Sequence, residues 1–238
     1  MRLAMWSGPR NLSTALMYAF GNRADFTVID EPFYAAYLAK TGFNHPMREA
    51  ILAAQPNDPA EVVESLLTWS QGGCQHVYQK HMTQHMVSDI PRAWMGDVTN
   101  VFLIRHPARV VASFASKFEK PTLEDLGFMQ QAALYDQLQV LGKRALVVDA
   151  ADIRSDPAGM LRRLCAALDL PFDPAMLSWP LGGHENDGVW AAHWYGAVHR
   201  STGFAGPEAP LPVLRGEAAN LAAEGMAVYD RLTAVKLG

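Results

Sequence analysis

Short apolar runs alternate along the chain with longer stretches that have the character of helices. The apolar runs predict strands at Arg2–Met5, Phe26–Ile29, His76–Tyr78, Asn100–Ile104 and Ala145–Val148. The clearest helices are predicted at Ser13–Gly21, Pro59–Ser70, Pro107–Ser116, Thr122–Leu141, Pro157–Leu168 and Gly216–Val235. Strands separated by helices favour an α/β fold, a three-layer αβα arrangement around a central parallel sheet. Ligands of such folds bind at the carboxyl ends of the strands.

Helix caps and loops complete this pattern. Thr122 and Asp125 approximate a capping box, and Asp156 caps a helix whose first residue is Pro157. No repeat and no linker is visible, so we expect residues 1–238 to form one domain. Residues 179–212 form a long irregular insertion that begins with many aromatic, glycine and polar residues. Loops of this kind often cover ligands.

Composition narrows the range of partners. Half of the 238 residues are hydrophobic, which is enough for a substantial core. The formal charge of −4 argues against broad electrostatic binding to nucleic acid or an anionic membrane, so positive charge must act locally. Cys74 and Cys165 provide no disulfide framework, and no apolar stretch is long enough for a signal peptide or membrane span. We therefore expect a cytoplasmic protein that binds a small anionic ligand.

The strongest chemical signal follows the first predicted strand. Gly8 and Pro9 permit a sharp turn, Arg10 adds a fixed positive charge, and Ser13 and Thr14 add hydroxyl donors at the start of a helix. The first N–H groups of a helix are unpaired and the helix dipole is positive there, which favours an anion. A surface turn would have the same sequence. A Gly-Lys-Ser/Thr motif is missing, which weakens the prediction of a magnesium–nucleoside triphosphate site.

A second basic segment follows the fourth predicted strand. Arg105 lies at the end of the strand, Pro107 suits the first turn of the next helix, and Ser113 lies about two turns further along. This segment predicts a second anion site. Arg105 could instead be a structural ion-pair partner, and Ser113 a residue of the helix surface.

Together the two segments resemble those of the sulfotransferases that use 3′-phosphoadenosine 5′-phosphosulfate (PAPS). In that family a Pro-Arg/Lys-Ser-Gly-Thr loop holds the 5′-phosphosulfate, and residues 9–14 are similar to it, with Asn11 and Leu12 in place of Ser-Gly. An Arg at a strand end and a Ser eight residues later hold the 3′-phosphate, as Arg105 and Ser113 would here. The resemblance implies a P-loop NTPase-like sulfotransferase fold. The co-substrate-binding residues that it implies are Arg10, Asn11, Leu12, Ser13, Thr14, Arg105, Ser113 and, from a late Arg/Lys-Gly loop, Arg200.

A candidate general base follows the second predicted strand. Some sulfotransferases have a catalytic Glu at such a position, so the resemblance makes Glu31 the first choice. Pro32 should hold Glu31 in an extended conformation and place its carboxylate beside the first loop. A structural salt bridge between Glu31 and Arg10 is the alternative.

The third predicted strand leads into further candidates. Lys80 and His81 are similar to the Lys-x-His segment of cytosolic sulfotransferases, although here the two residues are adjacent. His81 or His85 could remove the acceptor proton near neutral pH, and Lys80 could stabilise the bridging oxygen. The two histidines are spaced like metal ligands on one helix, but Met82 stands where a zinc protease has Glu, and no third ligand is visible. A structural or surface role for either histidine stays open, and no metal is expected.

The predicted function is therefore transfer of a sulfuryl group from PAPS to a hydroxyl or amine of a small-molecule acceptor. One alternative is an ATP-dependent phosphotransferase or nucleotide hydrolase of P-loop-like fold. Another is a noncatalytic nucleotide-binding module. A related pattern also occurs beside aminotransferase-like domains, but the chain has no independent pyridoxal-phosphate signature.

Overall fold

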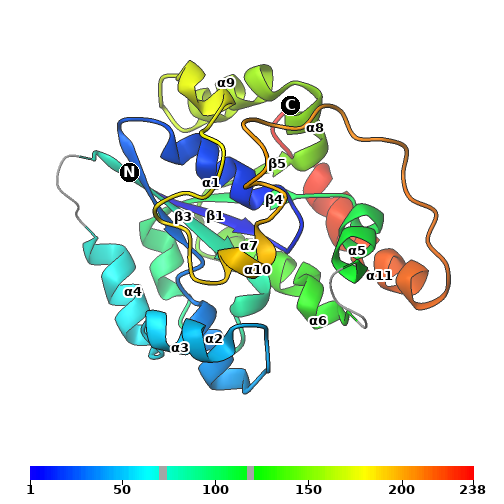
Figure 1. Ribbon diagram of the computed structural model, residues 1–238, viewed down its shortest axis with the longest axis horizontal. Helices are drawn as coiled ribbons and strands as arrows, with labels where there is room; N and C mark the ends of the chain where they lie inside the picture. The colour runs from blue at the N-terminus through cyan, green and yellow to red at the C-terminus, as the bar shows by residue number, and fades with distance from the viewer. Residues whose placement is uncertain (70–73, 117–120) are drawn as a thin grey trace.

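A five-stranded sheet forms the centre of the computed structural model, which describes residues 1–69, 74–116 and 121–238 (Figure 1). The strands are β1 (Arg2–Ser7), β2 (Phe26–Asp30), β3 (His76–Met82), β4 (Thr99–Ile104) and β5 (Ala145–Asp149). All neighbouring strands are parallel, in the order β2-β3-β1-β4-β5. The predicted α/β fold with a parallel sheet is confirmed. Each predicted strand is present, and β1 and β3 are extended at their carboxyl ends.

The strand order places a switch point between β1 and β4. After β1 the chain passes to β2 on one side of the sheet, and after β4 it passes to β5 on the other. Connections that diverge from adjacent parallel strands leave a crevice at their carboxyl ends. The loops that follow β1 and β4 carry the two predicted anion-binding segments, so both meet at this crevice.

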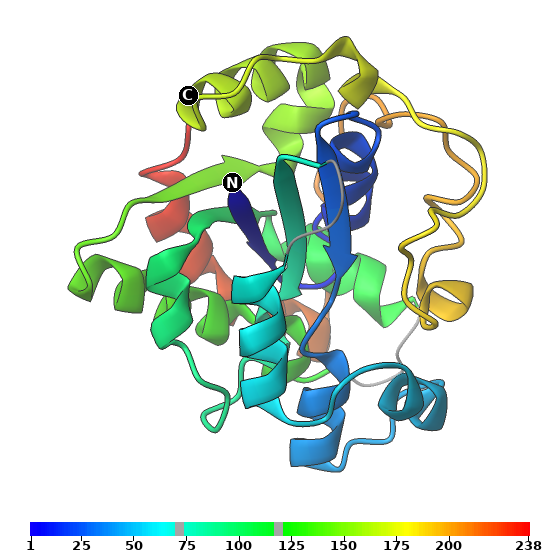
Figure 2. The ribbon, with the colours of Figure 1, turned by 90° about the vertical axis from the view of Figure 1, so that its left-hand side faces the viewer.

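Helices cover both faces of the sheet (Figures 1 and 2). Alternate strand residues divide between two apolar clusters, since neighbouring side chains of a strand point to opposite faces. Leu3 and Met5 pack with α1 (Ser13–Gly21), α8 (Ala150–Ser155) and α9 (Pro157–Ala167). On the other face, Ala4 and Trp6 pack with α4 (Pro59–Thr68), α7 (Phe128–Val140) and α11 (Gly216–Thr233). This arrangement is the predicted three-layer fold.

The predicted helix over residues 122–141 is wrong, because the structure has two helices there, α6 (Leu123–Leu126) and α7. They are separated by Gly127, whose φ of 67° lies in the left-handed region. Thr83 explains the break. Its hydroxyl donates to the Gly127 carbonyl at 2.9 Å, and a Cβ on Gly127 would lie 2.5 Å from that hydroxyl oxygen. The capping box of Thr122 and Asp125 is confirmed.

The other predicted helices are present with small changes at their ends. The cap of Asp156 is confirmed, since its carboxylate accepts from the Gly159 N–H at 2.9 Å. The α4 helix ends at Thr68, and the predicted end at Ser70 lies outside the described residues. The helix after β4, α5 (Pro107–Ala115), ends one residue early.

Among the described residues, four α-helices were not predicted, namely α2 (Tyr34–Thr41), α3 (Arg48–Ala54), α8 and α10 (Ala191–Trp194). Figure 2 shows α2 and α3 beyond the carboxyl end of β2. The segment over residues 179–212 is irregular apart from the one-turn α10 and a bridge between Ser178 and Gly203. No helix among the described residues is long and apolar enough to cross a membrane.

Candidate functional site

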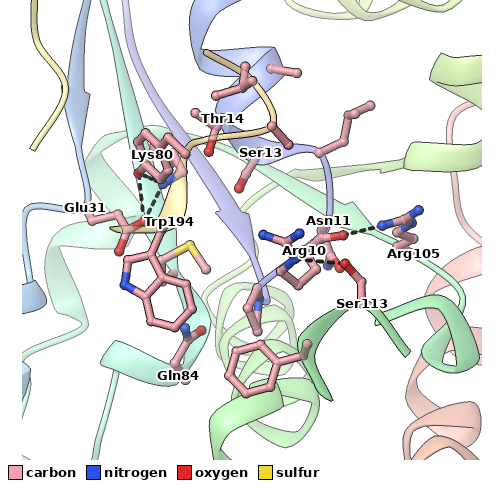
Figure 3. Close-up of a pocket in the computed structure, with 18 of the residues that line it drawn as sticks. Arg10, Asn11, Ser13, Thr14, Glu31, Lys80, Gln84, Arg105, Ser113 and Trp194 are labelled. Atoms are coloured by element: carbon pink, nitrogen blue, oxygen red, sulfur yellow. Dashed lines mark hydrogen bonds and ion pairs between the residues drawn. The ribbon is translucent and has the colours of Figure 1, made fainter. Parts of the chain in front are cut away.

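A cavity of about 340 Å³ lies at the switch point, between the strand ends and the irregular segment (Figure 3). Ten of the predicted site residues line it: Arg10, Asn11, Leu12, Ser13, Thr14, Glu31, Lys80, His85, Arg105 and Ser113. His81 and Arg200 do not line it. The cavity has two parts that differ in charge, which we call the arginine end (Arg10, Arg105, Arg154 and the first turn of α1) and the carboxylate end (Asp30, Glu31, Lys80 and Tyr195).

The first turn of α1 presents unpaired backbone donors to the cavity. Leu12 precedes the helix with a φ of 73°, and no side chain caps it. The first helical hydrogen bond runs from the Leu16 N–H to the Leu12 carbonyl, so the N–H groups of residues 13–15 have no acceptor within the helix. Asn11 fixes the loop to β4 by donating to the Leu103 carbonyl at 3.3 Å. These donors and the helix dipole favour a bound anion.

Arg10 joins the two basic segments. Its Nε donates to the Ser113 hydroxyl at 2.9 Å, and Arg105 donates to the Arg10 carbonyl at 2.6 Å (Figure 3). Within the described part of the chain, no carboxylate forms an ion pair with Arg10. Burial, together with the nearby Arg105 charge, lowers the pKa of the Arg10 guanidinium from its ordinary value. A half-buried guanidinium without a carboxylate partner, next to a helix N-terminus, is suited to an anionic ligand.

Arg105 has a second, structural partner in Glu208. The Glu208 carboxylate contacts Arg105 at 2.5 Å, Arg109 at 2.7 Å and Arg154 at 3.2 Å. Arg105 therefore faces the cavity and also forms the structural ion pair that was the alternative for it. Sequence reasoning missed Arg154, although a basic residue shortly after a strand end was the kind of signal used for Arg105. Glu208 lies in an irregular segment and had no local signal.

The carboxylate end is a buried cluster of ionic side chains. The Lys80 ammonium donates to Asp30 at 2.9 Å, to Glu31 at 2.5 Å and to the Tyr195 hydroxyl at 2.6 Å. Tyr195 also lies within hydrogen-bonding distance of both carboxylates, and Trp190 donates to its oxygen at 3.0 Å. Since an ammonium has three donors, Lys80 has none left for a ligand. Asp30 and Tyr195 were missed by sequence reasoning, because only folding brings residue 195 to β2.

Glu31 is not extended as predicted. Its φ is 41°, in the left-handed region, even though Pro32 follows it. Tertiary hydrogen bonds explain the difference. The Glu31 N–H donates to the Lys80 carbonyl at 2.9 Å, and its own carbonyl accepts from the Tyr34 N–H at 3.0 Å. The carboxylate pairs with Lys80 and not with Arg10, so the alternative salt bridge is absent.

The surroundings of Glu31 shift its pKa upward. Burial raises the pKa of Glu31, the Lys80 charge opposes that rise, and the Asp30 charge adds to it, with a net increase above the ordinary value. For Lys80, burial by itself lowers the pKa, but Asp30 and Glu31 outweigh burial and raise it. A carboxylate whose pKa is raised toward neutrality is a better proton acceptor than an ordinary one.

The adjacent residues Lys80 and His81 point to opposite faces of the sheet, as strand alternation requires. Lys80 faces the cavity. The His81 ring stacks on Trp6 in the other apolar cluster, with ring centroids 4.4 Å apart. Burial, with the Lys80 charge, lowers the pKa of His81 to about 3. His81 is therefore a neutral core residue, which was the structural alternative for it.

His85 lies in the 3-10 helix after β3 (Thr83–His85), so it does not share a helix with His81. Its ring is stacked between Tyr34 and Tyr37, with centroids 4.4 and 4.8 Å away. Its Nε2 atom is 3.9 Å from the Glu31 carboxylate. Burial lowers the pKa of His85 well below its ordinary value. No group of three or more metal-ligating side chains is found among residues 1–69, 74–116 and 121–238.

The irregular segment covers the cavity, as expected for such a loop. Trp194 lies beside Glu31 and Lys80 in Figure 3, and Ser201, Gly203 and Phe204 also line the cavity. Arg200 itself is exposed and outside the lining. The loop that contains Arg200 thus contributes Ser201, Gly203 and Phe204 to the cavity lining. The arginines that line this part of the cavity are Arg105 and Arg154.

The fold and the crevice define the class of protein. A similar fold occurs in the sulfotransferase domain from the curacin biosynthetic pathway, with a TM-score of 0.54 and 16% sequence identity. The similarity covers 93% of this chain and 96% of that one. The family model described as "Sulfotransferase domain" matches residues 1–236. This chain therefore belongs to the sulfotransferase domain family.

Two curated relatives are named for a different chemistry. The chain is 38% identical to "Branched-chain-amino-acid aminotransferase-like protein 1" of Arabidopsis thaliana and 36% identical to protein 2 of the same name, over 203 residues each. These matches cover 85% of this chain but only 36% of each relative. The chain thus spans about a third of the length of these relatives, and their names describe the longer proteins.

Proposed function

We propose that this chain transfers a sulfuryl group from PAPS to a hydroxyl or amine of a small-molecule acceptor. The observation that carries the proposal is the direct contact between the two basic segments, from Arg10 to Ser113 and from Arg105 to the Arg10 carbonyl. Two anion sites in one cavity suit a nucleotide with phosphates on both sides of its ribose. A nucleoside triphosphate has its phosphates in one chain and offers no such pair.

The donor would lie along the arginine end. Its 5′-phosphosulfate would accept hydrogen bonds from the unpaired N–H groups of α1, from the Ser13 and Thr14 hydroxyls and from the Arg10 fork. Its 3′-phosphate would lie against Arg105 and Ser113. Both groups are held by charge-assisted hydrogen bonds, which are the strongest kind available to a phosphate.

Glu31 would act as the general base. It removes the proton from the acceptor while the acceptor oxygen or nitrogen forms a bond to sulfur. The bond between sulfur and the bridging oxygen of the donor breaks, and its electron pair stays on the departing 5′-phosphate of 3′-phosphoadenosine 5′-phosphate (PAP). Arg10 and the N-terminus of α1 stabilise the charge on that phosphate, and most of the rate comes from this and from alignment. The step requires no metal.

Lys80 would act through Glu31, since its three donors are already used. It holds the Glu31 carboxylate in place and limits the rise of its pKa. His85 is the second candidate for the base. Its neutral ring lies 3.9 Å from Glu31, and its Nδ1 atom has no hydrogen-bond partner among the described residues.

Thermal unfolding with nucleotides tests the proposal. At a hundredfold excess over its dissociation constant, PAP should stabilise the protein by about 2.7 kcal/mol, or roughly 5 to 10 °C. ADP and magnesium–ATP serve as comparisons. Stabilisation by magnesium–ATP alone would overturn the sulfotransferase proposal in favour of phosphoryl transfer. PAP binding without turnover of PAPS across a broad acceptor panel would instead indicate a noncatalytic nucleotide-binding module.

A further inference from the structure

Glu208 occupies the place where the arginine end would hold a phosphate. Its side chain is only 5% exposed, and three guanidinium groups surround it at 2.5, 2.7 and 3.2 Å. Two of them, Arg105 and Arg154, also line the cavity. One carboxylate faces three arginines here, so the group keeps a net charge of about +2. A phosphate monoester has two charges and three acceptor oxygens, and it would match three guanidinium forks better than a carboxylate does.

The chain around Glu208 is attached to the protein mainly by the same arginines. Residues 205–212 have no regular structure and include three prolines, at positions 207, 210 and 212. Arg154 donates to the Gly206 carbonyl at 2.9 Å, and Arg109 donates to the Ala209 carbonyl. Apart from these two and the arginine contacts of the Glu208 carboxylate, no hydrogen bond joins residues 205–212 to the rest of the described chain. Figure 1 shows the segment (orange) along the outside of the molecule, in the last part of the insertion, before α11.

We propose that Glu208 is an internal anion that occupies the three-arginine site in the empty protein, and that the 3′-phosphate of the donor displaces it. Residues 205–212, which we call the Glu208 segment, then lose their main contacts and move away from Arg105, Arg109 and Arg154. This inference rests on the proposed function, because it assigns the 3′-phosphate to this site. It adds Arg109 and Arg154 to the residues that bind the donor.

Displacement predicts a dependence on one chemical group of the ligand. A nucleotide that must displace an internal competitor binds more weakly, because its affinity is multiplied by the fraction of protein molecules in which the site is free. Glu208→Gln keeps the shape of the side chain but removes its charge, so it should raise the affinity for PAP about tenfold. The affinity for AMP, which differs from PAP only in lacking the 3′-phosphate, should change less than about twofold. Glu217→Gln removes an exposed charge from the first turn of α11 and serves as the control.

Hydrogen exchange of the wild-type protein separates displacement from a simple charge effect. Ligands usually slow exchange near their site, but PAP should make the amides of the Glu208 segment exchange faster, while AMP should not. Slower exchange in the segment with PAP, or weaker PAP binding by Glu208→Gln, would overturn the inference and make Glu208 a residue that positions Arg105. Unchanged PAP binding by Glu208→Gln would overturn it as well.

Inorganic phosphate tests the displacement of Glu208 independently of the proposed function. Compared with chloride at equal ionic strength, phosphate should also speed exchange in the Glu208 segment, whichever nucleotide the protein uses. No effect of phosphate on the segment would count against the inference alone. Equal binding of PAP and AMP by the wild-type protein would overturn the proposed function and the assignment of the 3′-phosphate to this site; an effect of inorganic phosphate on the segment would then still support displacement of Glu208 by an anion.

Discussion

The arginine end and the carboxylate end of the cavity hold their charges in different ways. At the arginine end, Arg105 and Arg154 share the single carboxylate of Glu208 with Arg109, and Arg10 has no ion-pair partner among the described residues. At the carboxylate end, Lys80 is 1% exposed and two carboxylates and a phenol saturate it. The arginine end therefore has an excess of positive charge, whereas the ammonium of the carboxylate end has all its hydrogen-bond partners within the protein.

This difference indicates how each end works. An excess of guanidinium groups and unpaired helix N–H groups remains available to an outside anion. A saturated ionic cluster in the protein interior holds its members in fixed positions and shifts their pKa values. The arginine end is thus suited to binding, and the carboxylate end to proton transfer. Changes at four residues follow, in order of decreasing effect. The first three test this division between binding and proton transfer, and the fourth concerns the opposite face of β3.

The largest effect is expected from Glu31→Gln. Loss of the general base should lower kcat by about 10² to 10⁴. PAP affinity should change less than about twofold, because the arginine end is intact. The measurement is PAPS-dependent turnover with an active acceptor, together with a titration with PAP. Glu64→Gln, an exposed change on α4, is the control. Normal turnover by Glu31→Gln would assign the base to His85.

Arg10→Ala should affect both binding and rate. It removes the unpaired guanidinium beside α1, so kcat should fall about 10² to 10³ and PAP should bind more weakly. Arg10→Lys keeps the charge but loses the planar fork, and it should recover only part of the loss. Steady-state kinetics and calorimetry give the two quantities. Arg48→Ala, which breaks an ion pair with the exposed Glu49, controls for loss of an arginine. Equal PAP affinity of Arg10→Ala and wild type would contradict a donor site at α1.

Tyr195→Phe should disturb the carboxylate end while leaving all its charges. Buried groups that lose a partner cost about 1 to 3 kcal/mol, so the free energy of unfolding should fall by that amount. The Tyr195 hydroxyl also lowers the pKa of Glu31, so its loss raises that pKa. Because the base acts only when ionised, the acidic limb of kcat/KM should move to higher pH. Denaturant unfolding and a pH–rate profile test this, with Tyr135→Phe as control. A limb that stays in place would mean that Glu31 does not control it.

The smallest effect concerns His81, on the opposite face of β3. Its folded-state pKa of about 3 lies below its ordinary value of 6.5, so the unfolded chain binds a proton between these values that the folded protein excludes. This residue should therefore make stability fall as pH falls below 6.5, by up to about 1.4 kcal/mol per pH unit.

His81→Phe keeps a ring against Trp6 and should reduce that slope without altering PAP affinity. Unfolding midpoints between pH 5 and 8 measure the slope, and the exposed His193→Gln is the control. An unchanged slope for His81→Phe would contradict the proposal that His81 is a buried, neutral residue.

Local patterns in the sequence were sufficient for the sheet and for the two basic segments that contain Arg10 and Arg105. Apolar runs predict strands because a strand buried on both faces consists mainly of apolar residues. The turn after β1 likewise depends on residues that are neighbours in the chain, such as Gly8 and Arg10. Strand alternation also predicts that Lys80 and His81 lie on different faces of the sheet, because adjacent residues of a strand point to opposite sides. The capping box of Thr122 and Asp125 followed from a spacing of three residues.

Tertiary structure decided the rest, because the contacts join residues far apart in the chain. Tyr195 reaches Asp30 across 165 positions, and the resulting cluster sets the pKa of Glu31 and holds it at a positive φ that Pro32 alone would disfavour. Glu208 reaches Arg105 across 103 positions. The sequence by itself determined which segments could bind an anion. Only packing determined which charges remain free to do so, since that depends on the partners that the folded chain supplies.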